Sequence, residues 1–148
     1  MFVVQVEVYN MDGEEFIKSV IRSDLQQRCS SSSSEHPTDN SFHVVMNLPS
    51  SAVDFLGFFR GLLSAAEPPV STLPLVHCYT FSRADDPVTD AAQTMAVALG
   101  LASFDDLPDR SVRVVRNVAP GKEMVCVTFR LPWRVLAADE TGTHASLC

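Results

Sequence analysis

The chain has 148 residues, of which 46% are hydrophobic and 20% are charged, so it is long enough to bury the core of one domain. Its formal net charge is −7, from 18 acidic and 11 basic residues, and no run of Lys or Arg stands out. Because polyanion binding depends on neutralising phosphates with basic side chains, the composition argues against a strong nucleic-acid binder.

Nothing in the sequence points to a membrane, to secretion or to a metal. The longest apolar stretch is shorter than the roughly 20 residues that span a bilayer, and the first residues lack the features of a signal peptide. The four cysteines, Cys29, Cys78, Cys126 and Cys148, form no CxxC pair and have no His at metal-ligand spacing. We therefore predict reduced thiols, no metal, no membrane and an intracellular location in the cytoplasm, nucleus or mitochondrial matrix.

The chain begins with a predicted strand, a helix and a loop. Valines alternate with polar residues over residues 4–8, which indicates a strand with one apolar face near a sheet edge. Turn residues occupy 10–13, and apolar residues then recur at helical spacing over 16–25. The polar, serine-rich segment 29–40 is predicted to be an inserted surface loop.

A second strand and helix follow this loop. Residues 42–46 form a short apolar run, typical of a strand that is buried on both faces. Ser50 or Ser51 can cap the next helix, which carries an apolar stripe over residues 55–63. The Glu-Pro-Pro sequence at 67–69 is predicted to end this helix.

The last predicted elements complete an α/β fold. They are a strand at 75–81, a helix at 88–100 that closes on a glycine, and two strands at 112–118 and 124–131 joined by a Pro-Gly turn. Strands that alternate with helices form a parallel sheet, and the final pair predicts an antiparallel hairpin at its end. We expect one domain over residues 1–136, followed by a polar tail at 137–148.

Two predicted strand ends carry polar residues at the edge where open α/β sheets bind ligands. The first is the NMDG sequence with Asn10 and Asp12, where a carboxylate can accept from an exocyclic amine or a ribose hydroxyl. The second is the NLP sequence with Asn47 and Pro49, where an amide can hold the edge of a planar base. The residues leave a plainer alternative open at each position, namely an Asx-turn that starts a helix and a capped corner between strand and helix.

Other polar residues are expected to be structural. His43 and His77 stand in apolar strands and are predicted to be hydrogen-bonded core histidines. Arg116 and Lys122 are predicted to be solvated charges around the hairpin. The sequence contains no Ser-His-Asp spacing and no glycine-rich phosphate loop.

Four segments, in this order, closely resemble the eukaryotic and archaeal tRNA guanine-37 N1-methyltransferases: VYNMDGEEFI, HVVMNLPSSAVDFL, LPLVHCYTFS and VRNVAPGKEMVCVTFRLP. The resemblance spans residues 4 to about 132 and matches the carboxy-terminal part of such an enzyme. It implies a Rossmann-like class I methyltransferase sheet. It also implies S-adenosyl-L-methionine as methyl donor and N1 of guanosine 37 in tRNA as acceptor.

The resemblance also implies roles for the two polar corners. Asp12, with Asn10, would lie beside the adenine of the donor. Asn47 and Pro49 would lie against the target guanine and the methyl-transfer centre, with Asn47 also facing the donor. The general base is expected upstream, and tRNA would bind through the complete enzyme, because this acidic piece has no clear basic patch.

One departure from the family limits what this piece is expected to do alone. The family's glycine-bearing donor loop precedes the NMDG motif, and the sequence begins only nine residues before that motif. We therefore expect a sheet without its first two strands, a strand at 4–8 without its neighbour, and a fragment that is inactive alone. Two alternatives remain: the related wybutosine-pathway aminocarboxypropyl transferase, which uses the same donor, and a non-catalytic interaction module. The Asn of NLP favours methyl transfer.

Overall fold

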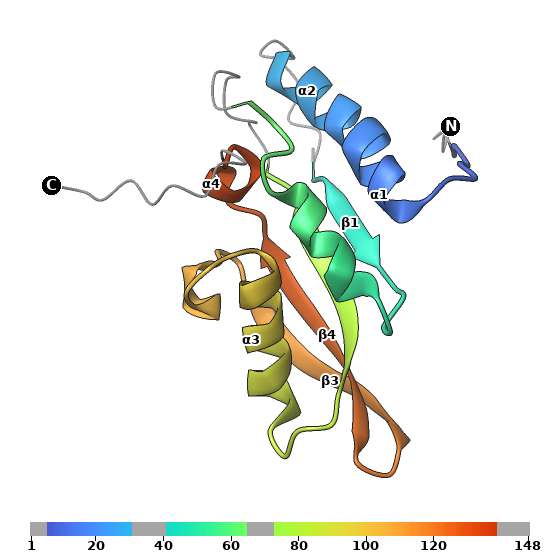
Figure 1. Ribbon diagram of the computed structural model, residues 1–148, viewed down its shortest axis with the longest axis vertical. Coiled ribbons are helices and arrows are strands. Elements are labelled where there is room, and N and C mark those ends of the chain that lie inside the picture. The colour runs from blue at the N-terminus through green and yellow to red at the C-terminus, as the bar shows by residue number, and fades with distance from the viewer. Residues whose placement is uncertain (1–5, 31–40, 65–72, 139–148) are drawn as a thin grey trace, which may run out of the picture.

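The computed structural model describes residues 6–30, 41–64 and 73–138 (Figure 1). Its four strands form one sheet in the order β1-β2-β4-β3, with β1 and β2 parallel and the other neighbours antiparallel. The predicted α/β class and closing hairpin are thereby confirmed, and most of the predicted tail lies outside the described residues. The strands are β1 (His43–Met46), β2 (Leu75–Ser82), β3 (Ser111–Ala119) and β4 (Lys122–Arg130).

The hairpin turns where the Pro-Gly sequence predicts it. Ala119 faces Lys122 across the pair, which leaves Pro120 and Gly121 as the turn. Gly121 has a φ of 64°, a left-handed conformation that glycine adopts without a steric penalty. The pairing shifts register beyond Val114, so β3 carries an irregularity next to the turn.

The amino-terminal helix is a single run with an unusual middle section. It comprises α1 (Gly13–Phe16), a π-helical segment η1 (Ile17–Ile21) and α2 (Arg22–Ser30). Its buried residues, Ile17, Ile21 and Leu25, belong to the hydrophobic core, as their spacing predicts. The loop was predicted to begin at residue 29, but α2 continues to Ser30. Residues 31–40, the rest of the predicted loop, lie outside the described residues.

The strand predicted at 4–8 is wrong where the structure describes it. Residues 6–8 form no strand, and the side chains of Val6 and Val8 are 75% and 90% exposed. A strand needs a neighbour to satisfy its backbone groups, and no described strand pairs with this segment. Residues 4 and 5 lie outside the described residues.

The burial predicted for the next strand is also wrong. β1 buries Val44 but leaves Val45 64% exposed, so only one of its faces is covered. It stands at the edge of the described sheet and pairs only with β2. The unbroken apolar run therefore predicts the strand correctly here, but it does not predict whether other residues cover the second face of that strand.

The corner after β1 is held by the main chain. The carbonyl of Leu48 accepts from the N–H groups of Ser51 and Ala52, at 2.9 and 2.7 Å. Ser51 precedes a 3-10 helix, η2 (Ala52–Phe59), but its side chain makes no capping bond, which corrects the predicted cap. The helix ends at Phe59, earlier than predicted, and residues 67–69 lie outside the described residues.

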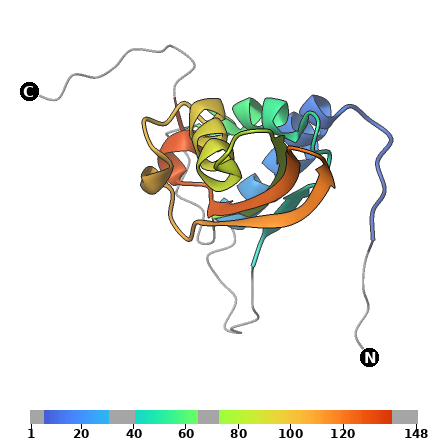
Figure 2. The ribbon, with the colours of Figure 1, turned by 90° about the horizontal axis from the view of Figure 1, so that it is seen from below.

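The third helix and η2 cover one face of the sheet. The helix α3 (Pro87–Ala98) is capped by Asp86, whose carboxylate accepts from two backbone N–H groups, and it is followed by Gly100 at φ 68°. Figure 2 shows α3 and η2 on the same side of the β3–β4 hairpin. Their side chains share a core with the buried side chains of β2 and β4. The short helices η3 (Phe104–Asp106) and α4 (Trp133–Leu136) complete the described elements.

Candidate functional site

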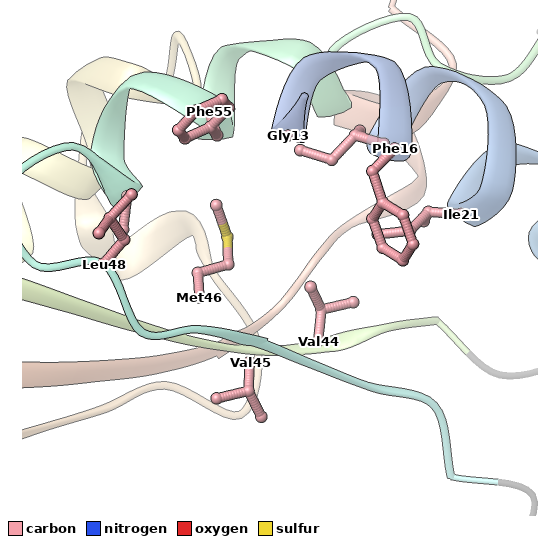
Figure 3. A pocket seen from close by; sticks show the side chains of 10 residues that line it. Gly13, Phe16, Ile21, Val44, Val45, Met46, Leu48 and Phe55 are labelled. Atoms are coloured by element: carbon pink, nitrogen blue, oxygen red, sulfur yellow. The ribbon is translucent and has the colours of Figure 1, made fainter. Parts of the chain in front are cut away.

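A pocket of about 170 Å³ opens between the start of α1, the strand β1 and η2 (Figure 3). Figure 3 shows Met46 pointing toward Phe55 and Val44 pointing toward Phe16, while Val45 points to the other side of the sheet. The pocket is smaller than the roughly 300–1,000 Å³ of typical small-molecule sites. Its walls are apolar and comprise Gly13, Phe16, Ile17, Ile21, Val44, Val45, Met46, Leu48, Ala52 and Phe55.

The pocket joins the two corners that the sequence singled out. Gly13 belongs to the NMDG sequence and Leu48 to the NLP sequence, and both line the pocket. A Cβ added at Gly13 would lie 2.8 Å from Cε1 of Phe55, so the close approach of α1 to η2 favours glycine. The structure therefore brings together two motifs that are separated by more than thirty residues.

The polar side chains of these motifs do not line the pocket. Asn10, Asp12 and Asn47 are exposed, and Pro49 is half-buried. Each is next to, or close in sequence to, a lining residue, but none is itself in the wall. The structure thus confirms the meeting of the corners, and the binding roles of these four residues remain predictions.

Asp12 has a structural role. One carboxylate oxygen, Oδ1, accepts from the backbone N–H of Glu14 at 2.8 Å and caps α1. The helix-starting turn, which the sequence left open as an alternative, is confirmed. Since the side chain is exposed, its second oxygen can still accept from a ligand.

Asn47 is placed differently. It directly follows the last residue of β1, and the corner behind it is held by backbone bonds to the carbonyl of Leu48. The turn does not need the Asn47 side chain, so the amide remains available for a ligand on an exposed strand end.

The described residues fit only one end of S-adenosyl-L-methionine. The apolar walls beside Phe16 and Phe55 suit a flat ring such as adenine, and Asp12 can accept from its exocyclic amine. The pocket wall supplies no polar side chain for the ribose hydroxyls or the amino-acid group of the donor. The described part of the chain therefore does not fit the whole donor.

A second, polar hollow lies beside the same helix and was not predicted from the sequence. It has a volume of about 440 Å³, and its sequence signal is weak because two of its seven lining residues come from a segment without regular secondary structure. Tyr9 donates to Glu7 there at 2.5 Å, and this bond is the main cause of a raised pKa of the Tyr9 hydroxyl. The hollow is lined by Glu7, Tyr9, Ser19, Val20, Ser23, Asp24 and Gln27.

The two strand histidines are hydrogen-bonded but are not core residues. His43 Nδ1 lies 2.9 Å from His77 Nε2, and His77 Nδ1 lies 3.0 Å from Thr128 Oγ1. His43 is exposed and His77 half-buried, because their face of the sheet is not the face packed by α3 and η2. Desolvation, and then the nearby charges of His43 and Arg113, lower the pKa of His77.

The two basic side chains at the hairpin differ in their exposure to solvent. Arg116 is exposed, as predicted. Lys122 is half-buried, and its Nζ lies 3.9 Å from the centroid of the Phe81 ring, a cation–π contact that corrects the prediction.

The described ranges contain no helix that is long and apolar enough to cross a membrane. In the same ranges, no three His, Cys, Asp or Glu side chains gather as a metal site would require. Cys78 and Cys126 are buried free thiols, as predicted. Cys29 belongs to α2, and Cys148 lies outside the described residues.

The chain matches curated proteins that carry one name. It is 42% identical over 137 residues to "tRNA (guanine(37)-N(1))-methyltransferase" of Mus musculus and 41% identical to that of Homo sapiens, and each match covers 93% of this chain and 26% of the relative. The Xenopus tropicalis protein of the same name is 42% identical over 96% of this chain and 28% of its own length. No protein-family model matches.

One solved structure also aligns, though loosely. Wild-type Trm5b from Pyrococcus abyssi overlaps 60% of this chain and 24% of its own, with a TM-score of 0.42 and 22% sequence identity. The chain spans only about a quarter of the curated relatives it matches. The motif-based resemblance is nevertheless confirmed by the curated relatives: this chain is a homologue of one part of the tRNA (guanine(37)-N(1))-methyltransferases.

Proposed function

We propose that this chain supplies the carboxy-terminal part of a tRNA methyltransferase that moves a methyl group from S-adenosyl-L-methionine to N1 of guanosine 37. The observation that carries the proposal is the identity of about 40% over 93% of the chain to proteins with that name. Because the chain covers about a quarter of those relatives, the proposed activity belongs to a larger assembly.

Three features of the described residues support this role. The NMDG and NLP corners meet at one apolar pocket, which suits the flat ring of an adenine. Asp12 is exposed and directly precedes Gly13, which lines that pocket. Asn47 presents an amide at the end of β1, where it would orient the edge of the guanine. The base that removes the N1 proton would come from residues outside this chain.

A chimera tests the proposal. The quarter of the mouse relative that matches this chain is replaced with this sequence, and the purified chimera is given donor and a tRNA transcript. We expect methyl transfer to N1 of guanosine 37, identified by mass spectrometry of the released nucleosides. A transcript with adenosine at position 37 is the control and should remain unmethylated.

The same assay separates the competing functions. A donor labelled in the methyl group and a donor labelled in the aminocarboxypropyl group report which part is transferred. Transfer of the larger group would replace the proposal with the aminocarboxypropyl transferase. A folded chimera that binds tRNA but transfers neither group would support a non-catalytic module.

The chain alone should behave as a fragment. We expect calorimetry to detect weak or no donor binding by the 148-residue chain, since the described pocket fits only one end of the donor. Low-micromolar binding would contradict this. A tRNA-modifying role also leads us to expect the protein in the cytoplasm, the nucleus or the mitochondrial matrix.

A further inference from the structure

The strands β2 and β4 extend beyond the end of β1, at the same end of the sheet as the NLP corner. β1 ends at Met46, which pairs with Cys78, whereas β2 continues to Ser82, roughly 13 Å farther along. Ser82 pairs with Glu123 at the start of β4, so the hairpin turn also lies at this end. Figure 1 shows this turn and the loop after β2 at the lower end of the molecule, toward which the β1 arrow points. We call the end of β1, the loop after β2 and the hairpin turn the carboxyl edge.

Basic side chains at the two ends of the sheet differ in their partners. At the opposite end, Arg110 lies 2.9 Å from a carboxylate oxygen of Asp105. Arg130, also at that end, lies 2.6 Å from a carboxylate oxygen of Asp109. Among the described residues, the basic side chains of the carboxyl edge form no ion pair with a carboxylate. They are Arg83, Arg116 and Lys122. The carboxyl edge therefore presents positive charge that the described chain does not neutralise by ion pairing.

The carboxylates near this edge are mostly held by other groups. Glu123 accepts from Nδ2 of Asn117 at 2.8 Å. Asp86 accepts from two backbone N–H groups at the start of α3. Asp85 is exposed two residues after Arg83, so it lowers the positive potential there without forming an ion pair. Three basic side chains thus gather at one end of a chain whose net charge is −7.

The two hairpin cations lie on one side of the sheet. Nζ of Lys122 lies 3.9 Å from the centroid of the Phe81 ring. Phe81 pairs with Met124, which pairs in turn with Arg116, and directly paired residues lie on the same side of a sheet. The ring faces the ammonium group from one direction, so N–H donors of Lys122 remain for an anion.

We propose that Arg83, Arg116 and Lys122 bind phosphates of the tRNA strand that carries the target guanosine. This inference rests on the proposed function, in which Asn47 orients the target base, and Asn47 directly follows the strand that ends at the carboxyl edge. A base held at that corner brings phosphates of its own strand to the same edge. Phosphate contacts of Arg and Lys set the position of a nucleic acid, so the three residues position the RNA and touch none of the reacting atoms. The sequence shows no basic run because folding brings these residues together.

The test measures binding of a labelled tRNA transcript by the chimera at several salt concentrations, using fluorescence anisotropy. Each phosphate contact to a single strand contributes about 0.7 to the slope of log affinity against log salt. R83Q/R116Q should therefore lower the magnitude of the slope by roughly one to one and a half, and should weaken binding by roughly ten-fold or more. Adding K122Q should lower the slope by about 0.7 more.

Matched variants separate the effect of charge from an effect on the fold. R22Q/R60Q removes the same charge from two exposed arginines outside the carboxyl edge, and should leave the slope unchanged and the affinity within about two-fold. R83K/R116K keeps both charges and should restore the slope. Circular dichroism melting shows whether each variant remains folded. Single-turnover methylation at saturating tRNA should stay close to the wild-type rate in R83Q/R116Q, because the arginines act on binding.

Failure of the phosphate contact can be told apart from failure of the proposed reaction. An unchanged slope in R83Q/R116Q, or an equal loss in R22Q/R60Q, would overturn the contact. Weaker binding that R83K/R116K does not restore would also overturn it, since the arginines would then act through the fold. A chimera that binds tRNA through these residues and transfers no methyl group would reject the reaction and keep the contact. A chimera that methylates guanosine 37 while R83Q/R116Q binds like the wild type would keep the reaction and reject the contact.

Discussion

His43 Nδ1 lies 2.9 Å from His77 Nε2, with the two imidazole rings nearly parallel at 6° and their centroids 5.2 Å apart. Thr128 extends the chain of contacts, because its hydroxyl lies 3.0 Å from the other nitrogen of His77. The three side chains connect β1, β2 and β4 across the sheet. One imidazole nitrogen must donate and the other accept, so the contact between the rings is lost when both are protonated.

This contact predicts how stability depends on pH. Desolvation, followed by the charges of His43 and Arg113, lowers the pKa of His77 below its ordinary value of 6.5. Between the lowered value and 6.5 the unfolded chain binds more protons than the folded chain. The contribution to stability is therefore fully present above pH 6.5 and is lost as the pH falls through this window.

Melting curves of the wild type and of His77→Gln, recorded on either side of pH 6.5, check this expectation. The wild type should lose more of its melting temperature on acidification than the variant, in which the titrating group is gone. Equal losses of melting temperature in the two proteins would show that groups other than His77 control the loss of stability at low pH.

Cys78 should be chemically silent in the folded protein. Its side chain is fully buried, and burial raises the pKa of its thiol to about 12, with a smaller effect from Cys126. The thiolate is the reactive form, so iodoacetamide should not label Cys78 at pH 8 in the native chain. Peptide mapping by mass spectrometry, with and without urea, measures this. Similar labelling in both conditions would contradict the buried position.

Asp12 should show two separable roles. Asp12→Ala removes the cap of α1 and should cost about 1 kcal/mol of the free energy of unfolding, whereas Asp12→Asn keeps a capping oxygen and should cost little. In the chimera, Asp12→Ala should weaken donor binding by about 1.5–3 kcal/mol and slow the chemical step less. Urea denaturation and donor calorimetry on the same pair of variants distinguish the roles. Unchanged donor affinity in Asp12→Ala would leave the residue with its cap alone.

Asn47 should affect rate and leave stability unchanged. Its side chain is exposed, and the backbone holds the corner beside it, so Asn47→Ala should leave the melting temperature unchanged. If the amide orients the guanine edge, single-turnover methylation by the chimera should fall by roughly ten-fold or more. Affinity for tRNA should remain, because phosphate contacts elsewhere position the substrate. A lower melting point with a normal rate would reject the role.

Local patterns in the sequence predicted the elements that depend on local physics. The Pro-Gly turn required the left-handed Gly121, and the buried side chains of the first helix recur at helical spacing. The predictions that proved wrong are those that depend on which other segment pairs with an element or packs against it. The alternation of valines at 4–8 indicates one apolar face but cannot supply a pairing partner, and Val45 looks the same in sequence whether or not a second layer covers it.

The candidate site likewise combines features that the sequence predicted with features that it did not. NMDG and NLP were recognisable as motifs, and they meet at one pocket although no strand precedes NMDG among the described residues. The cap made by Asp12 was one of two readings that the residues could not separate. The contact of Gly13 with Phe55 depends on the angle at which α1 approaches η2, which no sequence spacing encodes.

The position of β4 between β2 and β3 has a consequence for local unfolding. β4 is paired along both sides, whereas β1 is joined only to β2. Opening β4 would break two ladders, so its amides should exchange with deuterium on the timescale of global unfolding. The amides of β1 should exchange sooner, through an opening that leaves the hairpin folded. The edge beside the candidate pocket can therefore rearrange on a scaffold that stays intact.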